Sequence, residues 1–246
     1  MKISIVTAVY NRLTTIDEAL DSVAAQSHAD IEHVIQDGGS SDGTVCAITA
    51  RQDPLISFTS EPDFGIYDAI NRGISRATGD VIGLMHSDDF FADECVLARV
   101  ADILSDSTID GVYGDLDYVH ATDPSRIIRR WRSGAYNSSL LRKGWMPPHP
   151  TLYLRRDVFE RHGVYDTSFR IAADYDAMLR YLVKGQIKLA YIPEVMVKMR
   201  VGGESNRSLR KILQKSREDY RAIRRNGVGG IPTLAMKNLS KIRQFF

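Results

Sequence analysis

Asp88 and Asp89 are the residues of this sequence whose type and position most directly suggest chemistry. They follow an apolar run at residues 81–85 that has the right length for a buried strand. Two carboxylates at the end of such a strand could bind a divalent cation through oxygen, as Mg²⁺ and Mn²⁺ prefer. Asp is also common in turns and at helix N-caps, so a metal site and a simple turn both remain open for this pair.

Polar residues also end the first two predicted strands, at residues 9–12 and 36–39. In an open α/β sheet the ligand crevice lies at the carboxyl ends of the strands, so these segments should converge with the carboxylate pair. Asp37 could accept hydrogen bonds from a base or ribose, and Gly38 would let the backbone approach a ligand closely. Turn chemistry explains either segment alone, but three converging polar loops favour a nucleotide site. Neither a G-x-G-x-x-G nor a P-loop Lys pattern is present, which disfavours nicotinamide and P-loop chemistry.

The second half of the chain adds three candidates of less certain role. Asp174 begins a predicted helix, where an acidic residue is favourable with the helix dipole, but it could also be a general base. His149 lies between two prolines and could ligate a metal or contact an acceptor, although a lone His is more often structural. Trp145 could stack on a sugar face or simply pack.

These residues need elements that bring them together, and the first half of the chain predicts such elements. Strands are expected at residues 3–9, 31–35, 56–59, 80–87 and 111–118, and helices at 14–26, 44–51, 67–77 and 93–104. Strands that alternate with helices of this length predict a mostly parallel sheet with helices on both faces.

The second half is less regular. Strands are expected at residues 127–131, 151–154, 187–192 and 195–199, helices at 156–162 and 173–184, and a probable loop at 132–148. Apolar residues then recur at helical spacing from Leu209 to Ile223, and Met236, Leu239, Ile242 and Phe245 outline a last amphipathic helix.

The totals fit a soluble globular protein. The 246 residues are 43% hydrophobic and 26% charged, and no run approaches the roughly 18 apolar residues of a membrane span. No signal peptide is recognisable, so a cytoplasmic location is expected. Cys46 and Cys95 lack metal-site spacing and are expected to be reduced thiols.

The net charge of +1 is unevenly distributed. Residues 207–246 contain eleven Lys or Arg and two acidic residues, which gives +9 (11 − 2), and residues 1–206 therefore carry −8 (1 − 9). The tail could bind an anionic membrane surface as a basic amphipathic helix, or it could pack on the body of the protein. No nucleic-acid partner is expected, because a crevice lined with carboxylates repels phosphates unless a metal intervenes.

As an ordered set, five motifs resemble the family 2 glycosyltransferases. They are Thr-Ala-Val-Tyr-Asn-Arg at 7–12, Gln-Asp-Gly-Gly-Ser-Ser-Asp-Gly-Thr at 36–44, Glu-Pro-Asp-Phe-Gly-Ile-Tyr-Asp-Ala-Ile-Asn-Arg-Gly at 61–73, Ala-Thr-Gly-Asp at 77–80, and Ser-Asp-Asp at 87–89. The third motif, with Gly-Gly-Glu-Ser at 202–205, is similar to the branch that builds bacterial exopolysaccharides and glycolipids.

The resemblance implies a GT-A fold over residues 1–206, with a nucleotide-sugar-binding half at 1–118 and an acceptor-binding half at 119–206, followed by the basic tail. It implies inverting transfer from a UDP, GDP or dTDP sugar to a hydroxyl of a glycan or lipid-linked acceptor, with Mn²⁺ or Mg²⁺. The expected setting is cell-surface polysaccharide or glycolipid biosynthesis in the cytoplasm, peripheral on the inner face of the plasma membrane.

The resemblance also implies roles for single residues. Asp37 would read the base, Asp88 would lie near the ribose, and Asp89 would bind the metal that bridges the diphosphate. Asp174 would be the catalytic base. Further donor contacts are expected from Thr7, Tyr10, Asn11, Arg12, Gly38, Asp68 and Arg72. Trp145 and His149 are candidate acceptor contacts, and His149 could also ligate the metal.

The sequence departs from the family pattern at three positions. His86 stands where many members have Asp, Ala173 stands where many have Glu before the base, and Ile70 stands where many have Arg. The last departure leaves Arg72 as the candidate contact to the pyrophosphate. No Gln-x-x-Arg-Trp signature is present, which argues against a processive synthase.

Two alternatives remain at this point. A sugar-nucleotide nucleotidyltransferase also uses an α/β sheet and carboxylates, but it would be expected to carry a Gly-rich, basic loop after the first strand, which residues 10–14 do not supply. A non-catalytic nucleotide-sugar or glycan-binding module would tolerate the loss of Asp89 and Asp174, and both are present.

Overall fold

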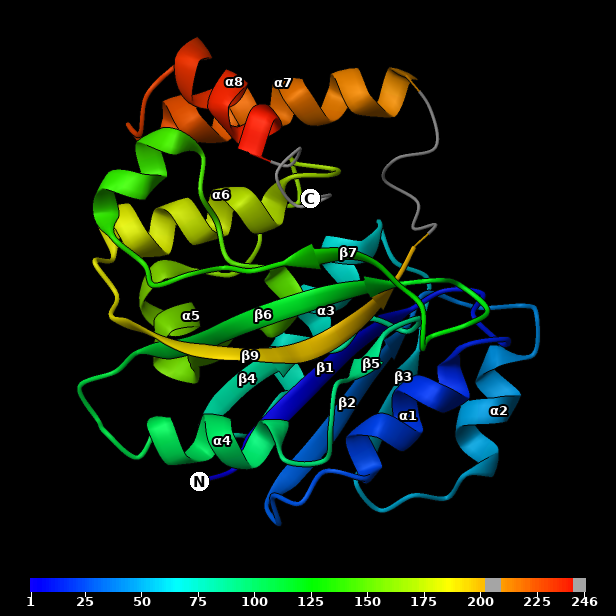
Figure 1. The fold of residues 1–246 in the computed structure, drawn as a ribbon. Coiled ribbons are helices and arrows are strands. Elements are labelled where there is room, and N and C mark those ends of the chain that lie inside the picture. Colours follow the sequence, from blue (N-terminus) through cyan, green and yellow to red (C-terminus); the bar gives the residue numbers. More distant parts are fainter. Residues whose placement is uncertain (202–208, 241–246) are drawn as a thin grey trace.

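The computed structural model describes residues 1–201 and 209–240 as a mixed α/β fold around one nine-stranded sheet (Figure 1). The order across the sheet is β3-β2-β1-β4-β8-β6-β9-β5, and β7 pairs with β6 outside this path. The strands are β1 Ile3–Val9, β2 Ile31–Asp37, β3 Ile56–Ser60, β4 Val81–Leu84, β5 Phe90–Phe91, β6 Gly111–Val119, β7 Ile127–Trp131, β8 Tyr153–Arg155 and β9 Leu189–Arg200.

The strand directions explain why the predicted loops meet. Strands β1 to β4 are parallel, and β8 runs antiparallel between β4 and β6. Strand β6 therefore runs the same way as β4, and β9 is parallel to β6. The carboxyl ends of β1, β2 and β4 lie at one edge of the sheet, which is where ligands bind in such folds.

Helices cover both faces of the sheet, as the sequence predicts. They are α1 Ile16–Ala24, α2 Thr44–Ala50, α3 Ile66–Arg76, α4 Val96–Ile103, α5 Arg156–His162, α6 Ala173–Leu179, α7 Leu209–Arg225 and α8 Ile231–Ser240, with the 3-10 helices η1 Ser138–Lys143 and η2 His149–Thr151 and the π-helix η3 Arg180–Lys184. One core cluster joins α3, α5 and α6 to the sheet, and α1, α2 and α4 lie against the opposite face.

The strands differ from the prediction in two respects. The two strands expected at 187–192 and 195–199 are one strand, β9, which begins at Leu189 and whose pairing with β6 shifts register between Tyr113 and Leu116. Pro193 lies at this irregularity, where its missing N–H explains why the pattern resembles two strands. Strand β5 was not predicted, because two residues are too few to give a periodic signal.

The described part of the basic tail is a pair of helices that packs on the body. Helix α7 contacts α6, and α8 contacts both α7 and η1 (Figure 1). The apolar stripe of α7 is packed only in part: Ile212 and Leu213 are 47% and 62% exposed, whereas Ile223 is buried together with Asp219 and Ala222. The predicted positions Ile242 and Phe245, and the motif at 202–205, lie outside the described residues.

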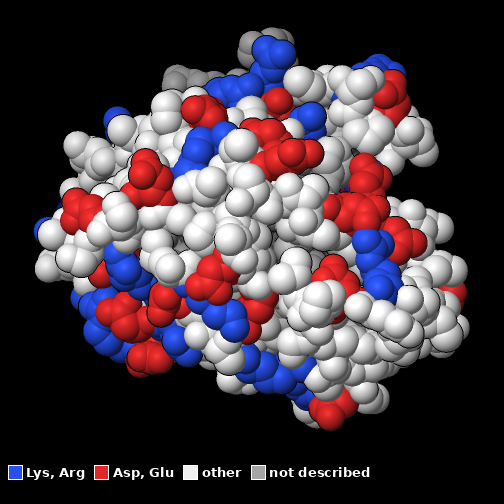
Figure 2. Space-filling model, turned by 90° about the horizontal axis from the view of Figure 1, so that it is seen from below, with Lys and Arg blue, Asp and Glu red and all other residues white. Residues whose placement is uncertain are grey.

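The surface opposite the tail carries charges of both signs. Figure 2 shows Lys, Arg, Asp and Glu side chains interspersed on this face. A protein face that binds nucleic acid is expected to be dominated by Lys and Arg, and this face is not. Among the described residues, no helix combines the length and apolar character needed to cross a bilayer.

Candidate active site

The loops after β1 and β2 are tied together by their own polar groups. Asn11 Oδ1 accepts a hydrogen bond from Ser41 N at 2.9 Å, and Asn11 N donates to Ser40 Oγ at 2.8 Å. Arg12 N donates to Thr44 Oγ1 at 2.9 Å. Asn11 has a positive φ of 51°, a conformation that Asn tolerates better than most residues. The two strand ends therefore form one continuous polar rim.

Asp37 organises this rim from inside. Its side chain is fully buried, and Oδ2 accepts hydrogen bonds from Gly39 N, Ser40 N and Ser60 Oγ at 2.9, 2.9 and 2.7 Å. Ser40 Oγ also donates to Oδ1. The turn role considered for this segment is therefore present, and the base-reading role of Asp37 stays a prediction. A Cβ at Gly38 would lie 2.4 Å from Asp63 Oδ2, so glycine allows the loop before α3 to approach the rim.

The other predicted donor contacts at the first strand differ in accessibility. Thr7 is fully buried, and its hydroxyl lies 2.8 Å from His33 Nε2, so its side chain is not part of the crevice surface. Burial lowers the pKa of His33 to about 3, which keeps this ring neutral at pH 7. Tyr10 is 59% exposed, and Arg12 is half-buried. Tyr10 is therefore the most accessible of these three side chains to a ligand.

Asp68 and Arg72 are paired with each other on α3. Arg72 Nη2 lies 2.8 Å from Asp68 Oδ2, and Arg72 Nη1 donates to Pro62 O at 3.0 Å. A partly exposed pair of this kind adds little stability, but it fixes the direction of the guanidinium. A pyrophosphate at Arg72 would have to compete with Asp68.

Asp88 and Asp89 occupy different environments in the turn after β4. Asp88 is half-buried, whereas Asp89 is 1% exposed. Asp89 Oδ1 accepts a hydrogen bond from Arg200 N at 3.0 Å, but the buried Oδ2 has no hydrogen-bond partner among the described residues. Burial, followed by the charge of Asp88, raises the pKa of Asp89 well above its usual value. Arg200 Nη1 also donates to Asp88 O at 2.7 Å, so the end of β9 holds this turn.

The carboxylate oxygens of this turn suit a metal ion whose remaining ligands come from the substrate and from water. The described residues contain no group of three or more His, Cys, Asp or Glu that could hold a metal ion by themselves. Mg²⁺ is usually bound by one or two carboxylates, with phosphate oxygens and waters completing its shell. The unpartnered Asp89 Oδ2 and the half-buried carboxylate of Asp88 meet that smaller requirement.

Asp174 lies at the start of α6 with one carboxylate oxygen held and the other unengaged. Oδ1 accepts a hydrogen bond from Tyr175 N at 2.8 Å and lies 3.2 Å from the Tyr67 hydroxyl. That hydroxyl is 2.7 Å from Ile171 O, so it can donate to either acceptor. Oδ2 accepts no hydrogen bond from the described residues. The arrangement leaves Oδ2 able to receive a proton.

A cluster of rings joins Asp174 to the carboxylate turn. Tyr67 stacks on Tyr165 with 5.8 Å between ring centroids, and the Tyr165 hydroxyl lies 2.8 Å from His149 Nε2. The His149 ring centroid is 6.1 Å from that of His86. Burial lowers the pKa of His86, and the nearby charges of Asp88 and Asp174 oppose that shift. A chain of ring contacts therefore runs from Tyr67, beside Asp174, to His86, which lies two residues before Asp88.

His149 and Trp145 are occupied by neighbouring side chains. Burial lowers the pKa of His149 to about 4, and its Nε2 is already used by Tyr165, so a structural role has its contacts in place. Trp145 Nε1 donates to Ser133 O at 2.9 Å, and its ring packs against Tyr113 and Tyr136. Their acceptor and metal roles stay predictions.

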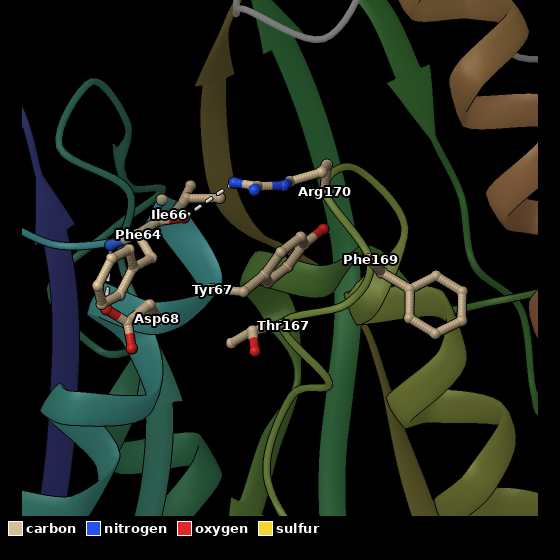
Figure 3. A pocket seen from close by; sticks show the side chains of 8 residues that line it. Phe64, Ile66, Tyr67, Asp68, Thr167, Phe169 and Arg170 are labelled. Carbon is tan, nitrogen blue, oxygen red and sulfur yellow. Dashed lines mark hydrogen bonds between the residues drawn. The ribbon is translucent and has the colours of Figure 1, made fainter.

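A small pocket lies between the start of α3 and the loop that precedes α6, and Tyr67, which contacts Asp174, is one of its lining residues. Figure 3 shows its lining: Phe64, Gly65, Ile66, Tyr67, Asp68, Thr167, Phe169 and Arg170. Arg170 Nη1 donates to Phe64 O at 3.1 Å and bridges the two sides. The cavity of about 20 Å³ holds little more than one water. A sugar would therefore need a larger opening than this pocket provides.

Three residues of the site were not singled out from the sequence. Tyr67 lies within the motif at 61–73, so a signal was present for it. Tyr165 and Arg200 carry no local signal, because each reaches the site from a distant part of the chain.

Residues 4–166 match a family model described as glycosyl transferase family 2. A PGL/p-HBAD biosynthesis glycosyltransferase of Mycobacterium bovis (strain BCG / Pasteur 1173P2) is 31% identical over 208 residues, which are 82% of this chain and 78% of that protein. An uncharacterized glycosyltransferase of Mycobacterium tuberculosis (strain H37Rv) is 31% identical over 187 residues, which are 72% of this chain and 68% of that protein.

Two solved structures share the fold at low identity. S. aureus TarS 1–349 in complex with UDP-GlcNAc superposes with a TM-score of 0.72 at 17% identity, over 93% of this chain and 66% of the TarS chain. This chain thus spans slightly less than two thirds of TarS 1–349. The mannosyltransferase PcManGT from Pyrobaculum calidifontis, in complex with GDP-Man and Mn²⁺, has a TM-score of 0.68 at 19% identity, over 96% and 68% of the two chains. The predicted GT-A fold is confirmed, and together with the family match it shows that this chain belongs to glycosyl transferase family 2.

Proposed function

We propose that this family 2 glycosyltransferase inverts the configuration of the sugar that it transfers, with Asp174 as general base. The carrying observation is that Asp174 Oδ2 accepts no hydrogen bond from the described residues, beside a chain of ring contacts that runs from Tyr67 to His86. Donor residues would come from the half at 1–118, and the base would come from the acceptor half at 119–206. The family match argues against the nucleotidyltransferase alternative.

In the proposed reaction, Asp174 Oδ2 takes the proton of the acceptor hydroxyl as that oxygen attacks the anomeric carbon of the donor. The bond to the nucleoside diphosphate breaks on the opposite face, and the diphosphate leaves with the electron pair. Tyr67 and the Tyr175 amide hold Oδ1, so the carboxylate keeps one orientation during proton transfer. A positioned general base of this kind contributes about 10²–10⁴-fold to the rate.

We further propose that the reaction depends on Mn²⁺ or Mg²⁺ held by Asp89 and Asp88. The ion, when bound, would stabilise the charge that develops on the departing diphosphate. Support comes from the buried, unpartnered Asp89 Oδ2, and from PcManGT, which has the same fold and was solved with Mn²⁺.

The donor is proposed to be a UDP, GDP or dTDP sugar, and the acceptor a glycan or a lipid-linked sugar of cell-surface polysaccharide or glycolipid synthesis. TarS is known with UDP-GlcNAc and PcManGT with GDP-Man, and the Mycobacterium bovis relative is named for PGL biosynthesis. These names support the class of donor and acceptor, and the sugar itself is left to experiment.

A thermal-shift screen tests the donor class. UDP, GDP and dTDP sugars, each with Mn²⁺, Mg²⁺ or chelator, should include one nucleotide that raises Tm only with a cation. Ligand at 100 times its Kd adds about 2.7 kcal/mol, and a chain of this size gains about 2–4 °C per kcal/mol, so a rise of about 5–10 °C is expected. Failure of every nucleotide sugar to raise Tm with either cation would contradict the proposal.

The tail helices are proposed to rest on an anionic membrane surface at the inner face of the plasma membrane. Both helices expose apolar side chains: Leu213 of α7 is 62% exposed, and Ile231 and Leu239 of α8 are 70% and 60% exposed. Helix α7 is rich in Lys and Arg. Exposed apolar residues among basic ones suit the headgroup region of anionic lipid.

Vesicle sedimentation tests this surface without removing the tail. The native chain should sediment with phosphatidylserine-containing vesicles and not with neutral phosphatidylcholine vesicles. Replacing Leu213 and Leu239 by Ser should reduce the bound fraction at least about threefold, because each exposed Leu contributes apolar burial only when lipid is present. Ile128→Ser, in exposed β7, is the matched control and should bind like the native chain. Equal sedimentation of the double variant would show that these residues do not contact lipid.

A further inference from the structure

The carboxylate of Glu218, on helix α7, binds the backbone of the loop that leads into α6, the helix that contains Asp174. Glu218 Oε2 accepts hydrogen bonds from the N–H groups of Arg170, Ile171 and Ala172 at 3.0, 2.7 and 3.0 Å. Glu218 Oε1 accepts a further hydrogen bond from Gln214 Nε2 at 3.0 Å. Three successive backbone donors directed at one anion form a nest, and hydrogen bonds to an ionised acceptor are stronger than neutral ones.

The same short loop contacts α3 through its other polar groups. Ile171 O lies 2.7 Å from the Tyr67 hydroxyl, and that hydroxyl lies 3.2 Å from Asp174 Oδ1. Arg170 Nη1 donates to Phe64 O, just before α3 begins (Figure 3). The loop is therefore held on one side by Glu218 and on the other by α3, and Asp174 follows it by two residues.

The residues that follow Asp174 are also bound by the tail. Asn226 Nδ2 donates to Asp176 Oδ1 at 3.0 Å. Lys237 Nζ lies 3.1 Å from the centroid of the Tyr175 ring and 2.7 Å from Asp219 Oδ1, and Lys237 and Asp219 are both buried.

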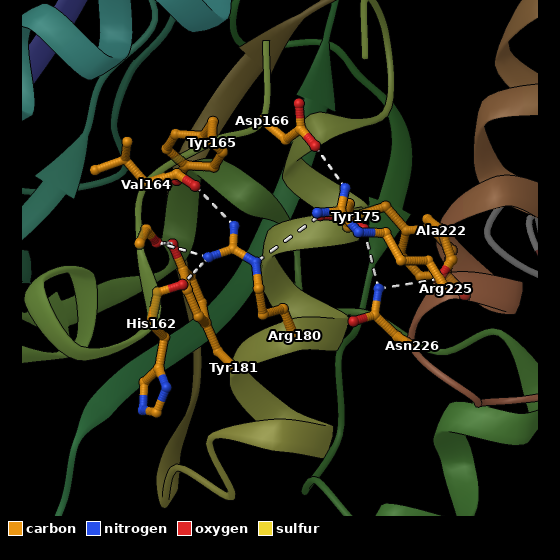
Figure 4. Close-up of polar contacts among 12 residues, drawn as sticks. His162, Val164, Tyr165, Asp166, Tyr175, Arg180, Tyr181, Ala222, Arg225 and Asn226 are labelled. Atoms are coloured by element: carbon orange, nitrogen blue, oxygen red, sulfur yellow. Dashed lines mark hydrogen bonds and ion pairs between the residues drawn. The ribbon is translucent and has the colours of Figure 1, made fainter. Parts of the chain in front are cut away.

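Helix α7 of the tail also contacts residues 166–169, which precede the loop. Arg225 pairs with Asp166, and the Arg221 guanidinium lies 4.4 Å from the centroid of the Phe169 ring (Figure 4 shows Arg225 and Asp166). Residues 166–176 are thus held along their length by α7 and α8. Both helices lie beyond residues 4–166, which the family model matches.

We propose that Glu218 is a positioning residue for the reaction, and that α7 sets the direction of the Asp174 carboxylate through the loop at 170–172. The proposal rests on the proposed function, because it takes Asp174 as the base. Without the anion, three N–H groups would turn toward other acceptors, the Ile171 carbonyl would move, and the Tyr67 hydroxyl would lose its fixed place. A displacement of about 1 Å at a reacting group can cost on the order of 10²-fold in rate.

The test compares three substitutions at this position in the full chain. Glu218→Ala should lower kcat about 10–100-fold while the donor KM changes less than about threefold, because the donor residues lie on other elements. Glu218→Gln keeps an acceptor oxygen and should recover most of kcat. Glu218→Asp keeps the charge but is one methylene shorter, and it should lose about fivefold or more. Arg217→Ala, at the exposed neighbour on α7, should behave like the native chain.

The outcomes separate positioning from stability. A native kcat in Glu218→Ala would overturn the proposal, and so would a loss shared equally between kcat and donor KM. If Glu218→Ala does not fold, Glu218→Asp decides: with an unchanged Tm, a native kcat overturns the proposal and a reduced kcat supports it. Asp174→Asn is measured in parallel. Turnover by that variant within about threefold of native would refute the base itself, whereas a strongly impaired Asp174→Asn beside a fully active Glu218→Ala would refute only the positioning role.

Discussion

Asp174→Asn should bind the nucleotide-sugar donor like the native chain and lose about 10²–10⁴-fold in kcat. Asn is nearly isosteric with Asp, and its Oδ1 can still accept from Tyr175 N and the Tyr67 hydroxyl. The amide nitrogen that replaces Oδ2 cannot take a proton from the acceptor. A loss of this size corresponds to about 3–5 kcal/mol of transition-state stabilisation. Donor affinity by titration calorimetry and kcat by release of nucleoside diphosphate separate binding from chemistry.

The control for this variant is Asp157→Asn. Asp157 also lies in the first turn of a helix, α5, but its side chain is exposed and it is outside the site. If the main role of Asp174 were to cap α6, the two variants should show similar small losses of stability and nearly native turnover. Turnover of Asp174→Asn within about threefold of native would return Asp174 to that capping role and leave the base unassigned.

The sequence predicted the part of the molecule that local patterns encode. The first strand, Ile3–Val9, is found at the predicted residues, and the helix expected at 67–77 is α3, Ile66–Arg76. The convergence of the loops after β1, β2 and β4 followed from the topology of parallel strands rather than from any single residue. The edge of the sheet that carries the site could therefore be predicted from the sequence alone.

The tail could not be placed from its pattern, because most of its buried groups are polar or small. Helix α7 buries Asp219, Ala222 and Ile223, and Asn226 directly after it is buried too, so that only one of these four residues is strongly hydrophobic. Asp219 and Lys237 are buried as an ion pair, and in a sequence such residues resemble a solvated surface. Of the apolar stripe, Ile212 and Leu213 are exposed and Ile223 is buried, so the stripe alone does not mark the packed face. Partners at such distances in the chain, like Glu218 and residues 170–172, have no sequence signal of their own.

Asp89→Asn should abolish the dependence of donor binding on Mn²⁺. Asn keeps an oxygen for the Arg200 amide, whereas Ala would leave that buried N–H unpaired at a cost of about 1–3 kcal/mol, so Asn isolates the ligand role. The substitution removes the carboxylate whose Oδ2 is buried without a partner. Loss of an outer-shell partner alone typically costs 10–100-fold in metal affinity, so the loss of a ligand should cost at least about 10²-fold. Calorimetric titration of UDP, GDP or dTDP with and without Mn²⁺ measures the effect, and Tm without cation checks the fold.

Asp88→Asn is the control that assigns the two carboxylates. Asp88 is half-buried and is proposed to lie near the ribose, so its variant should bind the nucleotide more weakly at every Mn²⁺ concentration but still respond to the cation. Asp89→Asn should show the reverse, with nucleotide affinity close to that of the native chain in chelator. If Asp88→Asn alone loses the Mn²⁺ response, then the half-buried carboxylate of Asp88 binds the ion and Asp89 serves to hold the end of β9 through Arg200. If both variants keep the response, neither residue is a metal ligand, and the dependence proposed for the reaction must arise elsewhere in the chain or not at all.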